Sequence, residues 1–549
     1  MVNKAVNSRL KTNVDFSAFI RVLLGLLLIS QIGVLFYFNL FQMKDHIGFD
    51  SSWMFLKVYL MKQEHCLFTG PWIEQTNLFL DSSMLFASLL YFATGRLFES
   101  FAVSNLTILA LNLICLNSII KKLDIGLTSR LFALNLLISP YLINGYNLEF
   151  PYYTDCFLTG AAVYNLRGLT VLLIIREFIL IRKTGKMDFL AWVSLALCFW
   201  SGISCGIYHL VVIILPCLVY IIYFKVLKDN KISNLKSKES LYAYILSIGV
   251  LTGKLVGSKF LGVQMFDATR TWTSLTELTE NAAAPILGFM KLIGVLPVAQ
   301  TDVYIMTVDG LTQLFPMFIF AVMATGLIYS FKYVIKNKAD ERHGIILMLL
   351  TVVTVNYVMF TLFNVDYGSY VFEERYLIST FMIVLVLTAI YLDHMDINNL
   401  LTKAVYCGLL ISVFANTSIS DIYYSRITNS YLQPEAITEA IEGEDAELIY
   451  VYGNELRTLE RVLRTYDLDH IYKSVSDDGT YYHWGDYLYY EDNQDYSGPT
   501  LLIVSREGSM VPDTVLDQYT LIQDFETVSI YRADTNPEVG VYNPETANT

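Results

Sequence analysis

Apolar stretches of about 20 residues recur along most of this sequence, and they limit what it can fold into. About 20 mostly apolar residues are needed for a helix to cross the hydrocarbon core of a bilayer. Hydrophobic residues make up 54% of the chain and charged residues only 16%, so we expect an integral membrane protein. The predicted membrane helices lie at 17–41, 100–119, 130–145, 160–181, 188–205, 207–226, 240–262, 311–331, 344–364, 377–393 and 401–420, the third interrupted by Pro140.

Lysine and arginine are distributed unequally between the two sets of loops that these helices define. One set, which includes the first 13 residues and Lys403, carries 19 of them. The other set, at 42–99, 146–159, 263–310 and 365–377, is longer and carries seven. Cytoplasmic loops hold the positive excess, so we predict that the N-terminus is cytoplasmic and the long loops face outside. Eleven crossings then place the segment after Asp421 on the outer side.

Residues 421–549 differ in composition from the rest of the chain. They contain 25 acidic and 7 basic residues, a net charge of −18, whereas the first 420 residues carry +5. The stretches "AELIYVYG", "DHIYKSV", "TLLIVSR" and "YTLIQDFETVSIYR" are rich in strand-forming residues, and "NELRTLERVLRTYDL" has apolar residues at helical spacing. We therefore expect a transmembrane domain at 1–420 and a small acidic α/β domain at 421–549. Its acidity argues against nucleic acid as a partner.

Two of the outer loops contain amphipathic sequence. In "SSWMFLKVYLMKQ", Trp53, Leu56 and Leu60 fall on one face of a helix, and "LTELTENAAAPILGFMKLIGVLP" behaves similarly. Amphipathic helices of this kind lie along a membrane surface. The expected fold is thus a polytopic bundle of about eleven membrane helices, N-terminus in and C-terminus out, with surface helices in the outer loops and an outer α/β domain.

Three short motifs in the outer loops accompany this layout. "GFDSSW" places Asp50 nine residues after Phe41, "TNLFLDSSMLFASLLYFATGRLF" contains Asp81, and "FEERYLIST" spans 372–380. Layout and motifs together resemble the GT-C glycosyltransferases, in particular the bacterial enzymes that use polyprenyl-phosphate sugars. In this sequence His46 follows Asp45, where the family has two adjacent acids.

The resemblance implies a substrate class and a location. Such an enzyme transfers a sugar from a polyprenyl-phosphate carrier to a glycan, lipid or protein acceptor of the cell envelope, at the outer face of a bacterial plasma membrane. The first outer loop supplies the catalytic carboxylate. No nucleotide-binding glycine motif and no metal-ligand spacing is present, so we predict no cofactor, although the resemblance leaves a divalent metal open.

Transfer of a sugar to a hydroxyl requires a general base for the acceptor proton. A carboxylate at the boundary of lipid and water suits this role, because partial desolvation increases its basicity. We expect Asp50 to be the base, with Asp45 as the reserve, and a single base on the acceptor side predicts inversion. Asp50 and Asp81 each also fit the N-cap of a helix, the role that we favour for Asp81.

The leaving phosphate requires cations. Lys254 and Lys259 lie within a predicted membrane helix, where ionisable groups usually face a cavity or a partner. Lys254 can contact either the ligand or a buried acid, and Lys259, near the outer end of the helix, can instead extend outward to the membrane surface. Arg167 lies about two turns below the outer face, and its alternative role is an ion pair with Glu149 or Asp155. The remaining candidates are Arg375, which can instead pair with Glu373 or Glu374, and His209, which can instead be a core histidine.

The outer loop before Arg167 contains candidates for binding the sugar. Tyr152, Tyr153 and Asp155 lie together in "NGYNLEFPYYTDCFL", where aromatic rings could stack on the pyranose. Glycines 249, 253 and 257 form a small-residue stripe for close helix packing.

Two other protein classes fit parts of the sequence. A transporter or a flippase for lipid-linked glycans would also have buried charges and a cavity, but the duplicated spans typical of many transporters are not evident. A scaffold that binds through its acidic domain is the third possibility, although eleven membrane helices exceed what an anchor needs.

Overall fold

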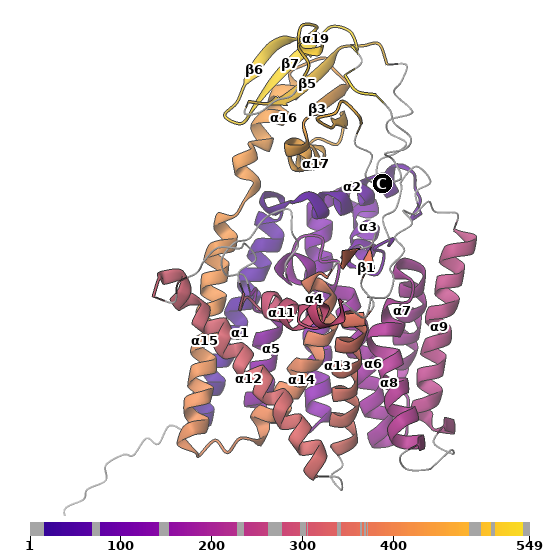
Figure 1. Ribbon diagram of the computed structural model, residues 1–549, viewed down its shortest axis with the longest axis vertical. Coiled ribbons are helices and arrows are strands. Elements are labelled where there is room, and N and C mark those ends of the chain that lie inside the picture. Colours follow the sequence, from indigo (N-terminus) through magenta and orange to yellow (C-terminus); the bar gives the residue numbers. More distant parts are fainter. Residues whose placement is uncertain are drawn as a thin grey trace, which may run out of the picture.

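A computed structural model gives the fold of the protein. It describes residues 16–68, 77–141, 153–227, 235–261, 277–296, 304, 306–337, 342–362, 365–366, 369–370, 372–481, 496–506, 511–537 and 539–541. The described part is a helical bundle with a small α/β domain at one end (Figure 1).

Each of the eleven predicted ranges overlaps a helical segment of the bundle. These segments are α1 (Phe16–Tyr37), α4 (Leu97–Lys122), α5 (Leu127–Ile138), α6 (Asn165–Thr184), α7 (Phe189–Cys205), α8 (Leu215–Tyr220) with its flanking π-helical turns, α9 (Lys238–Phe260), α12 (Val308–Lys336), α13 (His343–Leu362), α14 (Ile378–His394) and α15 (Leu400–Arg426). Seven helices in the described residues are long and apolar enough to cross a membrane. The helical membrane fold is thus confirmed, whereas the number of crossings and the orientation stay predictions.

The third predicted span is shorter than the others. α5 ends at Ile138, and Ser139 after it has an extended backbone. Pro140 accounts for this end, because the residue before a proline is driven out of the helical conformation.

A close contact between α7 and α9 explains the glycine stripe. A Cβ added at Gly253 would lie 2.0 Å from the Phe199 carbonyl oxygen, and one added at Gly202 would lie 2.3 Å from the Val250 carbonyl oxygen. Only residues without a side chain permit this approach, so the predicted packing role of the stripe is confirmed.

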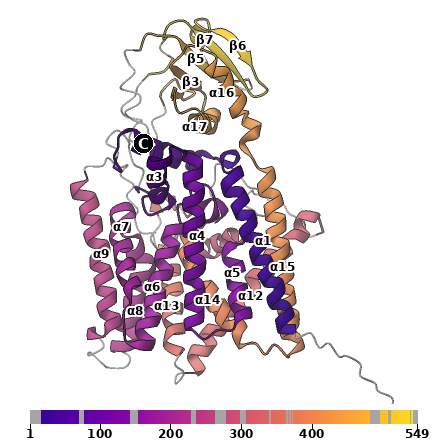
Figure 2. The same ribbon diagram turned by 180° about the vertical axis from the view of Figure 1, so that it is seen from behind.

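Short helices cover the end of the bundle beneath the α/β domain (Figures 1 and 2). They include α2 (Phe49–Gln63), which contains the predicted amphipathic stretch, and α3 (Ser83–Thr94). In the second predicted outer loop, α10 (Leu278–Asn281) and α11 (Ala284–Leu292) are short helices, and their placement along the membrane surface stays a prediction. Trp53, Leu56 and Leu60 of α2 are buried.

The α/β domain is built on a five-stranded mixed sheet in the order β4-β3-β5-β7-β6. Its strands are β3 (Leu448–Tyr452), β4 (Ile471–Val475), β5 (Thr500–Ser505), β6 (Thr520–Asp524) and β7 (Val528–Ala533). β3 pairs in parallel with β4 and β5, and β7 pairs antiparallel with β5 and β6. Successive residues of β3 enter opposite cores, because strand side chains alternate between faces: Ile449 packs with α16 (Pro434–Glu442) and α17 (Arg457–Tyr466), and Tyr450 packs on the other face.

No break in the helix marks the predicted domain boundary at Asp421, because α15 continues to Arg426. Below the α/β domain, the Tyr59 hydroxyl of α2 donates to the Leu468 carbonyl oxygen at 3.0 Å. The Tyr466 hydroxyl of α17 donates to the Lys44 carbonyl oxygen, also at 3.0 Å. The domain therefore directly contacts the segment between α1 and α3, which is the first predicted outer loop.

Candidate active site

Asp50 and Arg375 meet near the end of the bundle that faces the α/β domain (Figure 1). Asp50 lies in the first turn of α2, and its Oδ2 is 3.1 Å from Nη1 of Arg375. The Asp50 side chain is 41% exposed and that of Arg375 is 22% exposed, so the pair is accessible to a ligand. The N-cap position of α2 is Gly48, so the N-cap role considered for Asp50 is wrong.

Arg375 belongs to a larger group of charges. It lies in the 3₁₀ turn Glu374–Leu377, which leads into α14, and its Nε also contacts the Glu373 carboxylate. The ion pair with Glu373 that the sequence allowed is therefore present. Beside it, Lys291 of α11 is 3.4 Å from the Glu374 carboxylate. Two cations and three carboxylates thus lie on segments that converge here.

An apolar cavity of about 290 Å³ adjoins these charged segments. It lies between α11, α12, α13 and α14 and is lined by Pro285, Ile286, Phe289, Phe320, Met323, Ala324, Leu327, Val353, Thr354, Tyr357, Leu377, Thr380 and Val384. Leu377 follows Arg375 by two residues, and α11 carries both lining residues and Lys291. The cavity therefore has an apolar interior and cations on the segments that form its wall.

Two further acids of the predicted outer loops, Asp155 and Asp45, have different neighbours. Asp155 accepts a hydrogen bond from the Tyr424 hydroxyl at 3.3 Å. Asp45 is half-buried below the α/β domain, beside Tyr466. Burial raises the pKa of Tyr466, and the negative charge of Asp45 raises the pKa further.

Of the two tyrosines predicted to bind sugar, Tyr153 is a core residue. It is 1% exposed, its ring stacks on Phe157, and its hydroxyl donates to the Leu137 carbonyl oxygen. Its predicted position in a sugar pocket is wrong. Tyr152 and Glu149 lie outside the described residues.

Arg167 forms an ion pair with Asp81, whereas the sequence suggested Glu149 or Asp155 as its partner. It is 2% exposed, and its Nε and Nη2 donate to the two oxygens of Asp81 at 2.8 and 2.9 Å. Ser204 and Ser201 of α7 also donate to Asp81. Burial alone would raise the pKa of Asp81, but the Arg167 guanidinium outweighs it and lowers the pKa to about 2.

The cluster around Asp81 is a structural clamp. The N-cap of α3 is Ser82, whose side chain accepts from the Met84 N–H, so the capping role favoured for Asp81 is wrong. Asp81 instead joins the segment before α3 to α6 and α7. His209 is 1% exposed and contacts Ser201 Oγ at 2.6 Å and the Arg167 carbonyl oxygen at 3.3 Å. These partners support its alternative role as a core histidine.

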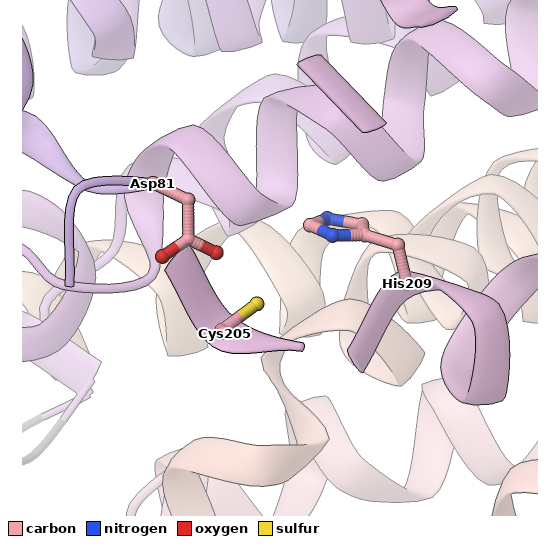
Figure 3. Close-up of side chains that lie close together, drawn as sticks. All are labelled: Asp81, Cys205 and His209. Atoms are coloured by element: carbon pink, nitrogen blue, oxygen red, sulfur yellow. The ribbon is translucent and has the colours of Figure 1, made fainter. Parts of the chain in front are cut away.

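The same cluster includes ligand types for a metal ion. Within the described part of the chain, Asp81, Cys205 and His209 place ligand atoms within 4.8 Å of one another, and Figure 3 shows the side chains pointing toward one another. Both Asp81 oxygens are already bound by the Arg167 guanidinium. A permanent cation against the only carboxylate would repel a metal ion, so these residues do not fit a metal site.

Lys254 and Lys259 are exposed on α9, a helix at the edge of the bundle (Figure 1). The glycines of α9 face α7, whereas both lysines are exposed. The prediction that Lys254 faces an internal cavity or partner is therefore wrong, whereas the exposure of Lys259 agrees with its alternative role as a lysine that extends outward.

Two basic residues, Lys291 and Lys57, were not among the residues predicted from the sequence. Lys291 had a signal, because it follows the apolar residues of an amphipathic segment in an outer loop. Lys57 is fully buried and donates to the Leu78 carbonyl oxygen at 2.7 Å. Its signal was its place four residues after Trp53, on the apolar face of α2.

Comparison with solved structures shows what the fold resembles. ArnT from Cupriavidus metallidurans in the apo state aligns over 92% of this chain and 97% of its own, with 10% identity and a TM-score of 0.56. The structure of the same protein bound to undecaprenyl phosphate aligns over the same shares, with 10% identity and a TM-score of 0.53. ArnT is a GT-C glycosyltransferase, so the predicted GT-C resemblance is confirmed at the level of the fold. No family model and no curated protein matches the sequence.

Proposed function

We propose that this protein is a glycosyltransferase that moves a sugar from a polyprenyl-phosphate carrier to an acceptor hydroxyl at the outer face of a bacterial plasma membrane. The observation that carries the proposal is the apolar cavity whose wall continues into the segment of Arg375, the partner of Asp50. A carrier with an apolar chain and a charged phosphate requires an apolar cavity next to cationic side chains. The ArnT fold supports it, because ArnT has been solved with undecaprenyl phosphate.

The cavity accounts for the carrier's apolar part. It is lined almost entirely by apolar side chains of α11 to α14. Burial of isoprenoid carbon in such a cavity is favourable by roughly 25 cal/mol per Å² of apolar surface. In this proposal, part of the polyprenyl chain occupies the cavity and the rest stays in the bilayer.

Arg375 and Lys291 account for the phosphate. Each is now paired with carboxylates, Arg375 with Asp50 and Glu373 and Lys291 with Glu374. An arginine can bind a phosphate through two parallel hydrogen bonds. We infer that the donor phosphate takes over Nη1 of Arg375 and so releases Asp50 from its ion pair.

Asp50 then acts as the general base. Its carboxylate accepts the proton of the acceptor hydroxyl while the acceptor oxygen bonds to the anomeric carbon. The bond between that carbon and the phosphate oxygen breaks, and polyprenyl phosphate leaves with its negative charge held by Arg375 and Lys291. Attack from the face opposite the phosphate inverts the anomeric centre. Asp45 lies in the same loop as Asp50 and is therefore the reserve base. It is not the first choice, because it lies beside the α/β domain, next to Tyr466.

Replacement of Asp50 in the native host tests the proposal. We expect Asp50→Asn protein to accumulate normally in the membrane and to leave the cell-envelope glycans as they are in a deletion strain. Asp45→Asn tests the reserve base, and Asp517→Asn, in an exposed turn of the α/β domain, is the matched control.

Mass analysis of the envelope glycans and lipids separates the outcomes. Loss of one sugar from its acceptor in Asp50→Asn cells supports the transferase. Normal glycans in these cells would refute Asp50 as the base. Sugar-loaded carrier retained on the cytoplasmic side would instead identify the protein as a flippase.

A further inference from the structure

A second cavity, of about 190 Å³, lies between α2 and the α/β domain. It is lined by Leu56, Tyr59, Leu60, Gln63, Arg464, Asp467, Leu468, Asp469, His470, Ile471 and Tyr472. The volume is smaller than the roughly 300–1,000 Å³ of sites for drug-sized ligands, so it suits one small ring. Unlike the cavity in the bundle, this one is walled largely by polar side chains.

The orientation of His470 in this cavity is fixed. Its Nδ1 lies 2.8 Å from Oδ2 of Asp467, and Tyr472 donates its hydroxyl to the same carboxylate at 2.7 Å. A carboxylate only accepts, so Nδ1 carries the hydrogen and Nε2 of the neutral ring is an acceptor. The side chain of Asp467 is 4% exposed. The buried carboxylate thus positions an imidazole acceptor at the cavity.

The remaining polar side chains give the cavity both hydrogen-bond donors and acceptors. Arg464 supplies donors near the buried end, and it is held 3.2 Å from Glu460. Gln63 and Asp469 are exposed at the rim. Hydroxyl groups both donate and accept, so a ring with several hydroxyls matches this alternation of donors and acceptors. An anion would meet Asp467 and Asp469, with an arginine that is already paired as the cation.

The cavity is connected to the proposed active site through α2. This helix carries Asp50 in its first turn, and Tyr59 nine residues later lines the cavity. At 1.5 Å per residue the two positions are about 14 Å apart along the helix axis. A ring bound in the cavity is therefore not the ring that reacts at Asp50.

We propose that this cavity is a saccharide subsite, which binds a neutral sugar ring of the acceptor while another part of the acceptor reaches Asp50. The assignment of the ring to the acceptor rests on the proposed function, whereas the binding of a sugar ring does not. The acceptor is then a glycan or a glycolipid.

Direct binding of simple sugars to the full-length protein tests the subsite. The protein is placed in phospholipid nanodiscs, because maltoside detergents would themselves supply sugar. Saturation-transfer NMR is recorded with methyl glycosides of glucose, galactose, mannose and N-acetylglucosamine at millimolar concentration. The variants are His470→Phe and Gln63→Leu, and the exposed Gln63 can be replaced without disturbing the core. Their controls are His65→Phe, at an exposed residue beyond α2, and Gln523→Leu, on the exposed strand β6.

We expect at least one glycoside to bind the wild-type protein and to bind both cavity variants at least tenfold more weakly, with unchanged binding to both controls. Absence of binding for all four glycosides, equal binding by the cavity variants, or displacement of the glycoside by inorganic phosphate would overturn the proposal. Asp50→Asn protein separates the two proposals, since it should bind the glycoside normally. If it binds the glycoside and its host has normal glycans, Asp50 is refuted as the base while the subsite stands.

Discussion

Arg375 and Asp50 are 325 positions apart in the sequence, yet their side chains form an ion pair with an N–O distance of 3.1 Å. In this arrangement the proposed base and the proposed phosphate ligand neutralise each other. A substrate phosphate that competes for Arg375 would release the Asp50 carboxylate when the donor is in place. Under the proposed function, the pair would couple donor binding to activation of the base.

The first prediction concerns Arg375. Arg375→Ala should reduce sugar transfer by about 10²–10³-fold, because a cation that stabilises the leaving phosphate contributes roughly that much. Arg375→Lys should retain part of the activity, since it keeps the charge and loses the planar fork. Transfer in reconstituted liposomes, with Arg506→Ala in the α/β domain as the control, measures both. Equal activity of Arg375→Ala and wild type would exclude this role.

The second prediction concerns the apolar cavity. Ala324→Trp should fill part of it and weaken binding of undecaprenyl phosphate, because the indole occupies space that the carrier needs. Ala321→Trp is the matched control, since Ala321 is exposed on the same helix almost one turn away. Native mass spectrometry of protein–lipid complexes gives the bound fraction for each. Similar loss of lipid in both variants would show that the cavity does not hold the carrier.

The third prediction concerns the buried pair of Asp81 and Arg167. Asp81→Asn should destabilise the fold by about 3–5 kcal/mol, because it leaves a guanidinium buried without a countercharge. The double variant Asp81→Asn/Arg167→Met should recover much of this loss. Thermal unfolding in detergent gives the order of stabilities. A double variant as unstable as the sum of the two single ones would contradict the clamp, because coupled residues are not additive.

The fourth prediction concerns the contact of α7 with α9. Gly253→Ala should destabilise the protein by about 1–3 kcal/mol, since the added methyl group meets the backbone of α7, which cannot rotate away as a side chain could. Gly33→Ala in α1 has open space around the new methyl group and should be neutral or slightly stabilising. The difference in melting temperature between the two variants is the measurement. A Gly253→Ala protein as stable as Gly33→Ala would show that the helices are further apart.

The fifth prediction concerns Lys473 on β4. Burial lowers the pKa of Lys473 from 10.5 to about 8. Below pH 8 the ammonium is charged in both the folded and the unfolded states, so folding bears the full cost of burying it. Between pH 8 and 10.5 the folded state loses the proton that the unfolded state keeps, so the stability contributed by this residue rises with pH.

Lys473→Met should therefore increase the stability of the sheet at pH 7. It should also remove the part of the increase in stability above pH 8 that Lys473 contributes. Hydrogen exchange of the β3 and β5 amides follows the stability of the sheet. Lys336→Met, at an exposed residue near the end of α12, serves as the control. If the stability of the wild-type protein falls between pH 8 and 10.5, and falls equally in Lys473→Met, the predicted rise in the contribution of Lys473 is contradicted.

Local patterns in the sequence determined much of the architecture. The membrane helices follow from apolar stretches of the right length, and Pro140 accounts for the end of α5 at Ile138. The strands and α17 of the α/β domain follow from residue type and periodicity. The close packing at Gly253 follows from the spacing of small residues. These features depend on neighbours within one element, so the sequence contains them.

Tertiary structure decided which charges meet. Arg167 pairs with Asp81 and not with Asp155, Lys254 lies on an exposed face of α9, and Tyr153 is a core residue. Asp50 and Arg375 were separate candidates in the sequence, and only the fold makes them partners. The physical reason is that a pairing depends on how each helix is rotated and on which helix packs beside it. Contacts between residues far apart in the chain set both, and no local pattern records them.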